Sequence, residues 1–330
     1  MPHSRIHEVK IRGPINKRWP PVSQQIVFGA EGFKEENIEA IIRRFANRAY
    51  RRAPTELEIQ QLLDVFQSRK QDGRSPRQAT IDAIKAALCS PAFLYLAEPG
   101  QQQGKLSAHD LASRLSYFLS ASTPDTTLRK LADNGVLLKA GELSAQVDRL
   151  LANPEAEEFY AGFLDSWLNL RALGGMPPDR AAFREYYSRD LESAMKTEAR
   201  LFFRNLVENN LPASQFLDSK YTFANKPLAR LYGLPAKFEP HRSHVFKKVE
   251  FSDSRRGGLL GMGAALTVTA NGIETSPVTR GVWFLENLLG TPPPPPPDEV
   301  PPIDPDSRGA NSIREQLAKH RELPTCAGCH

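Results

Sequence analysis

The sequence predicts a mainly α fold, made of packed helical modules with one small β-element near the N-terminus and another around residues 244–251. Apolar residues recur every three or four positions through most of the chain, which is the spacing of one helix face. Capping pairs precede several of these stretches, such as Thr55 with Glu58 and Ser107 with Asp110. Alternation of apolar and polar residues, which is typical of strands, is confined to short stretches.

Residues 1–34 are predicted to be the tail of a β-module. Residues 7–11 alternate apolar and polar positions, Gly13-Pro14 supplies a turn, and residues 25–28 form a second short strand that ends at Gly29. Because two strands cannot bury a core by themselves, we expect the beginning of this module to lie outside the sequence.

Two helical modules follow, at residues 35–99 and 105–235, and a linker rich in Pro, Gly and Gln separates them. In the first module, helices are expected from residue 35, from Thr55 and over residues 76–89. In the second, a helix begins at Ser107 and others follow at about 125–134, 141–152, 154–171 and 188–209. The last presents an apolar face to the core, made by Leu191, Met195, Phe202 and Leu206.

A third helical module is expected at residues 240–291, and its first element is a strand at 244–251. A glycine-rich stretch follows at 256–263, which invites a dinucleotide-binding interpretation, but Leu266 stands where the third glycine of G-x-G-x-x-G is required. Close packing of small residues is the alternative. Ser276 as N-cap and Pro277 as first residue begin another helix, whose apolar face is Val278, Val282, Leu285 and Leu289, before Gly290 ends it.

Six consecutive prolines at 292–297 open a Pro-rich linker over residues 292–308. Such a run adopts polyproline II and spans ~19 Å at about 3.1 Å per residue. We expect it to be an extended spacer that separates the final segment, 309–330, from the helical body. Docking of the prolines on an aromatic surface is the alternative.

Composition places the chain among ordinary folded proteins, with 40% hydrophobic and 25% charged residues. The net charge of +5 is scattered and both signs interleave, so we expect no nucleic-acid partner. No run of about eighteen apolar residues occurs, so no membrane span is expected, and the N-terminus lacks the apolar core of a signal peptide.

The most informative motif is Cys326-Ala327-Gly328-Cys329-His330, the C-x-x-C-H attachment signature of c-type haem. Thiols three positions apart can form thioethers with the vinyl groups of one porphyrin, and the adjacent imidazole can ligate the iron. We therefore expect Cys326 and Cys329 to hold haem c covalently and His330 to be the proximal iron ligand. A zinc site or a chance match are the alternatives, although zinc normally needs four ligands and the third cysteine, Cys89, stands alone.

Several stretches resemble a known group. The resemblance is carried in part by residues 51–55, 88–95, 111–119 and 221–225. The most specific stretches are Arg-Gly-Gly-Leu-Leu at 256–260, Thr-Ser-Pro-Val-Thr-Arg-Gly at 275–281, and Leu289-Gly290 before the prolines and the final C-x-x-C-H. Together they are similar to the multi-module cytochrome-c-like proteins of Planctomycetes, which are built from serial domains of unknown function. The resemblance implies haem c and export to the periplasm or cell exterior.

The same resemblance implies that the sequence is a fragment, because the family has an upstream portion, and a methionine and a further module after the haem motif. We expect that missing module to pack on the haem end. The 330 residues alone are expected to hold haem poorly and to lack a fixed sixth ligand, since Met176 and Met262 lie outside any obvious core face and no motif points to either.

Three functions stay open from the sequence. The first is electron transfer with a redox partner protein that the sequence does not name. The second is a redox-coupled enzyme in carbohydrate or other polymer breakdown, although no catalytic constellation emerges. The third is a binding scaffold without active haem. His241 and His244 flank the expected strand and are interpreted as surface residues.

Overall fold

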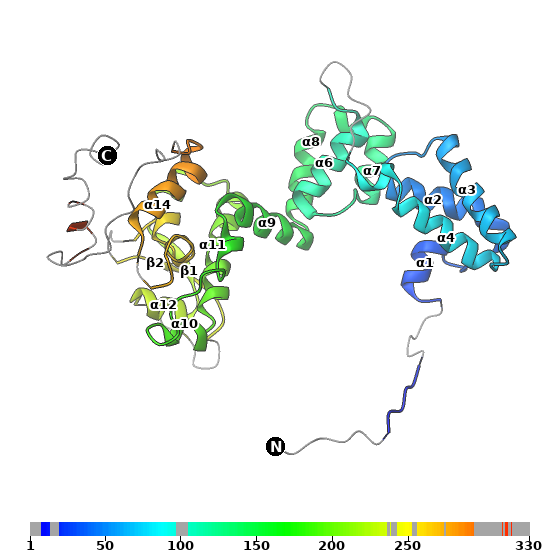
Figure 1. The fold of residues 1–330 in the computed structure, drawn as a ribbon. Coiled ribbons are helices and arrows are strands. Elements are labelled where there is room, and N and C mark those ends of the chain that lie inside the picture. The colour runs from blue at the N-terminus through cyan, green and yellow to red at the C-terminus, as the bar shows by residue number, and fades with distance from the viewer. Residues whose placement is uncertain are drawn as a thin grey trace, which may run out of the picture. The chain divides into compact units, whose positions relative to one another are not determined.

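The computed structural model describes residues 8–13, 20–96, 105–235, 238, 243–252, 256–273 and 275–293, with residues 312, 314, 315 and 318 in addition. The chain divides into two units, Met1–Phe163 and Leu164–His330, which are taken one at a time below. Helices dominate both units, as the labelled elements of Figure 1 show, so the predicted mainly α fold is confirmed. No helix in the described part of the chain is both long and apolar enough to span a bilayer.

The first unit begins with a small helical bundle. Its helices are α1 (Val22–Phe28), α2 (Ile38–Ala49), α3 (Glu56–Gln71), α4 (Pro76–Leu88) and α5 (Pro91–Leu94). Helices α2, α3 and α4 pack against one another (Figure 1). Their shared core contains Ile42 of α2, with Ile59, Leu62 and Phe66 of α3. The capping box of Thr55 and Glu58 is present at the start of α3, as expected.

The prediction of a strand at residues 25–28 is wrong, because these residues belong to helix α1. Phe28 is buried against Ile41 and Ile84, which anchors the segment on the helical bundle. Tertiary packing therefore overrides the local strand preference of Ile26-Val27-Phe28. Gly29 ends the helix with a φ of 98°. Residues 8–13 contain no strand either, so the predicted N-terminal β-element is not found among the described residues.

The remainder of the first unit contains α6 (Ala108–Ser120), α7 (Thr126–Asp133), α8 (Glu142–Leu151) and the start of α9 (Glu157–Trp167). Ser107 and Asp110 form the expected capping box of α6, and Leu115 and Leu119 lie in the core. Phe118 lies on the outer side of α6, with 58% of its surface exposed. Its ring instead contacts the ring of Phe159 with centroids 5.1 Å apart.

The second unit is built around α11 (Leu191–Glu208), whose four predicted inward residues are all buried. The shorter helices are α10 (Arg184–Ser188), α12 (Lys226–Tyr232), α13 (Gly263–Val268) and α14 (Pro277–Phe284). Strands β1 (Tyr221–Ala224) and β2 (Lys247–Glu250) pair antiparallel, with Tyr221 opposite Glu250. The strand predicted within 244–251 is therefore confirmed, whereas β1 was not predicted.

Helix α14 begins as expected, with Ser276 accepting a hydrogen bond from the Thr279 amide and Pro277 as the first residue. Its expected apolar face is wrong in part. Val278 and Leu289 are exposed, and the buried residue is Trp283, whose Nε1 donates to the Leu168 carbonyl at 3.1 Å. The α-helix continues as a π-helical turn at Leu285–Leu289, which changes the helical spacing and moves Leu289 off the face that simple periodicity predicts.

Candidate functional site

The predicted haem residues Cys326, Cys329 and His330 lie outside the described residues, as do His241 and residues 294–311 with most of the proline run. Cys89 is described and is exposed at the end of α4. His244 is also exposed, in agreement with its interpretation as a surface residue. Within the described ranges no group of three or more His, Cys, Asp or Glu side chains is placed to hold a metal ion.

The two methionines singled out from the sequence lie in different environments. Met176 is 65% exposed, whereas Met262 is only 3% exposed. The expectation that Met262 lies outside the core is therefore wrong. It immediately precedes α13, a short helix whose residues Gly263, Ala264 and Ala265 are buried with it.

The glycine-rich stretch before α13 serves close packing. Gly258 has a φ of 56°, and a Cβ at this position would overlap the backbone of Phe216 and Leu217. A Cβ at Gly263 would lie 2.8 Å from the Tyr232 hydroxyl and 2.9 Å from Met195. The small-residue interpretation of residues 256–263 is thus supported by the geometry, because both glycines admit a neighbouring segment that any side chain would displace.

A buried carboxyl group lies at the centre of the second unit. Glu198 on α11 has no exposed surface, and its Oε1 accepts a hydrogen bond from the Thr222 hydroxyl of β1 at 2.5 Å. Its Oε2 accepts one from the Tyr232 hydroxyl of α12 at 2.6 Å. The Tyr232 oxygen accepts in turn from the Gly263 amide of α13 at 2.6 Å. We call these four residues, with Arg256, the Glu198 network; it joins three helices and one strand.

The electrostatics of the Glu198 network are dominated by burial. Burial raises the pKa of Glu198 to about 7, although hydrogen bonds from Thr222 and Tyr232 and the charge of Arg256 act in the opposite direction. Burial also raises the pKa of Tyr232 well above its usual value, and the neighbouring Glu198 adds to that shift. The Arg256 guanidinium lies over the Tyr232 ring, 4.2 Å from its centroid. The carboxyl group itself is sealed from solvent, whereas Tyr232 and Arg256 of the Glu198 network line a neighbouring pocket with Leu260.

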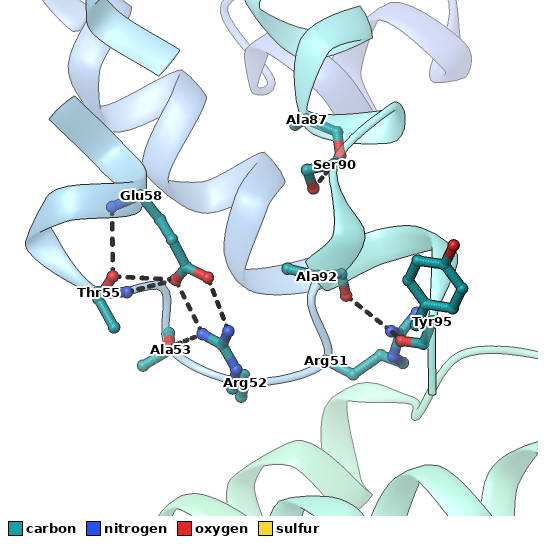
Figure 2. A network of polar contacts seen from close by, with 9 residues as sticks. All are labelled: Arg51, Arg52, Ala53, Thr55, Glu58, Ala87, Ser90, Ala92 and Tyr95. Atoms are coloured by element: carbon teal, nitrogen blue, oxygen red, sulfur yellow. Dashed lines mark hydrogen bonds and ion pairs between the residues drawn. The ribbon is translucent and has the colours of Figure 1, made fainter. Parts of the chain in front are cut away.

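A second polar network, in the first unit, surrounds Arg51, which has a φ of 61° and is buried (Figure 2). Its Nη2 donates to the carbonyls of Ala92 at 2.8 Å and Tyr95 at 3.0 Å, and its Nη1 donates to Phe93 at 3.2 Å. These carbonyls belong to α5 and its end, where a helix lacks internal donors. Arg51 therefore caps α5 with a cation.

The neighbouring Arg52 has a different partner in the same figure. Both of its terminal nitrogens donate to Glu58, at 2.7 and 2.9 Å, while Glu58 also accepts from the Thr55 amide (Figure 2). Hydrogen bonds from Arg52 lower the pKa of Glu58 to about 2, against the smaller opposing effect of burial. The Arg51-Arg52-Ala53-Pro54-Thr55 stretch is thus explained by structural roles at the ends of two helices.

Three family models match consecutive parts of the chain. Residues 37–98 match PSD5, described as protein of unknown function (DUF1595), and residues 106–234 match PSD4, described as protein of unknown function (DUF1592). Residues 256–330 match PSCyt3, described as protein of unknown function (DUF1588). All three models are described only as proteins of unknown function. No curated protein and no solved structure matches the chain.

Proposed function

We propose that this chain is part of an extracytoplasmic c-type haem protein that transfers electrons. The observation that carries the proposal is the Cys326-Ala327-Gly328-Cys329-His330 motif, which falls at the end of the 256–330 match to PSCyt3, a model whose name also refers to a cytochrome. Attachment of haem c takes place outside the cytoplasm, so the proposal includes a periplasmic or extracellular location.

The donor set at residues 326–330 fits haem c chemically. In each thioether bond, a cysteine S–H adds across a vinyl C=C of the porphyrin, so the step needs no oxidant and releases no leaving group. The neutral His330 imidazole supplies a nitrogen ligand for the iron. Bound haem would supply a one-electron couple, and the helical modules would present it to a redox partner protein.

Haem staining after denaturing electrophoresis tests covalent attachment. The chain is expressed in the periplasm behind an added export signal, together with a cytochrome maturation system. We expect stain in the wild type, and loss of stain in Cys326→Ala and Cys329→Ala. Cys89→Ala is the matched control, because Cys89 is free and exposed and its loss should leave the stain unchanged. Stain that persists in both motif variants would contradict the proposal.

Spectroscopy distinguishes the remaining functions. Reversible reduction of the bound haem by a small electron donor, without any substrate, supports electron transfer. Reduction that requires a polymer or carbohydrate substrate would instead favour the redox-coupled enzyme. Absence of a haem spectrum from the exported, folded protein would leave a binding scaffold. We also propose that the 330-residue chain alone lacks a fixed sixth ligand; a stable low-spin spectrum with a methionine–iron band would overturn this.

A further inference from the structure

An apolar groove on the second unit lies apart from the Glu198 carboxyl group and has a volume of about 760 Å³. Pockets of about 300–1,000 Å³ are the usual size for small-molecule sites. Side chains of α11, α12, α13 and the loops beside them make its wall, including Leu191, Met195, Leu231, Leu266 and Ile273. The groove is therefore formed within one unit and by several elements that are distant in sequence.

Among the described residues, the Arg280 guanidinium lines this groove without a compensating carboxylate. Arg280 on α14 is half-buried, and its Nη2 donates to the Thr275 hydroxyl at 2.6 Å while its Nε lies 3.3 Å from the Thr269 hydroxyl. Among the described residues Arg280 forms no ion pair, and its Nη1 has no hydrogen-bond partner. Thr269 is itself buried and donates to the Ala265 carbonyl at 2.7 Å. The Arg280 guanidinium is thus held in place by two neutral hydroxyl groups. These contacts leave its positive charge unbalanced and some of its N–H donors without a hydrogen bond.

The other charged residues at the groove do not cancel this cation. Arg184 and Glu185 of α10 also line it, but Glu185 pairs at 3.0 Å with Arg189, the residue that follows the helix. Counting only the residues that the structure describes, the charge at the groove is therefore positive beside an apolar wall. A half-buried guanidinium is most strongly stabilised by a carboxylate, which it can bind through two parallel hydrogen bonds.

We propose that this groove binds a small amphipathic carboxylate, with its apolar body against the wall and its carboxylate on Arg280. A straight-chain or aromatic monocarboxylic acid has this chemistry. The inference is independent of haem attachment, because it rests only on residues of the 176–280 region.

Calorimetric titration of the full 330-residue chain with decanoate tests the proposal, and decanamide serves as the uncharged ligand of equal length. We expect decanoate to bind at least tenfold more tightly than decanamide, because a charge-assisted hydrogen bond contributes about that much affinity or more. Arg280→Met should weaken decanoate about tenfold to a hundredfold and leave decanamide unchanged. Arg280→Lys should restore part of the loss, since it keeps the charge and loses the paired geometry.

Two further variants keep the test decisive. Ala182→Trp adds bulk at an exposed position of the groove lining, so it should weaken both ligands without removing a buried side chain. Arg204→Met removes an arginine that pairs with Glu208 and does not line the groove, so both affinities should stay unchanged. Failure of the wild type to bind decanoate at millimolar concentration would overturn the proposal, as would unchanged decanoate affinity in Arg280→Met.

Discussion

Replacing Glu198 by glutamine should remove a pH dependence from the stability of the second unit. Glu198 is fully buried, and burial raises its pKa from an ordinary value of 4.5 to about 7. Below pH 4.5 the group is protonated in both the folded and the unfolded chain. Between pH 4.5 and 7 it ionises in the unfolded chain and keeps its proton in the folded one, so rising pH favours unfolding.

The magnitude follows from this window. Each pH unit between the two pKa values is worth about 1.4 kcal/mol, so the free energy of unfolding should fall by about 3 kcal/mol from this group alone. Above pH 7 the folded chain ionises as well, and the loss is complete. Glutamine is uncharged throughout and resembles the protonated acid in shape and in its mixed donor and acceptor capacity. The free energy of unfolding of Glu198→Gln should therefore lack this fall with rising pH.

Urea unfolding from pH 4 to pH 8 measures the effect through tryptophan fluorescence. Trp167 and Trp283 both lie in the second unit, and Trp19→Phe removes the remaining tryptophan, so the signal reports on that unit. The difference in unfolding free energy between wild type and Glu198→Gln should change by about 3 kcal/mol across the range. Glu208→Gln, on the surface of the same helix, should show no comparable change. A difference that stays constant with pH would refute the reasoning.

Two other variants test packing and capping. Gly258→Ala should destabilise the second unit by about 2 kcal/mol or more, because its φ of 56° and the nearby Phe216 carbonyl leave no room for a Cβ. The control Gly281→Ala, in α14 where a Cβ would meet nothing, should be neutral or stabilising in the same urea assay; equal losses in both variants would contradict this account. Arg51→Met should cost about 2 kcal/mol, since it leaves the Ala92, Phe93 and Tyr95 carbonyls without their donor. Hydrogen exchange should accelerate at the amides of Phe93, Leu94 and Tyr95, whereas the exposed neighbour Arg48→Met should leave exchange there unchanged; unaltered exchange in Arg51→Met would count against the capping role.

Much of the helical architecture was predictable because its signals are local. The capping boxes at Thr55 and Ser107 and the N-cap at Ser276 each depend on residues three positions apart, and all three formed as expected. Segments whose state depends on distant partners were not predictable. Residues 25–28 are helical because Phe28 packs on the helical bundle, and β1 exists because Tyr221–Ala224 pairs with residues 247–250.

The candidate haem site depends wholly on a sequence motif. Cys326, Cys329 and His330 were identified by spacing alone, and they stay a prediction because the structure does not describe them. The groove at Arg280 has the opposite character. Thr275 and Arg280 lie in the 275–281 stretch, but the rest of its wall comes from segments between residues 176 and 273, so only the arrangement of these segments in space reveals the groove.

Glu198 is an intermediate case between a site identified by motif alone and one revealed only by the structure, because its burial could have been inferred from helix periodicity. It lies three residues after Met195 and four before Phe202, on the face that the apolar pattern of α11 assigns to the core. An acid at such a position requires hydroxyl or amide donors from neighbouring elements, because an unpaired buried carboxylate is strongly destabilising. Periodicity does not identify those donors, since Thr222, Tyr232 and the Gly263 amide follow it by 24 to 65 positions. An ionisable residue on the apolar face of an otherwise regular helix therefore indicates a buried polar network, whose remaining members only the folded structure reveals.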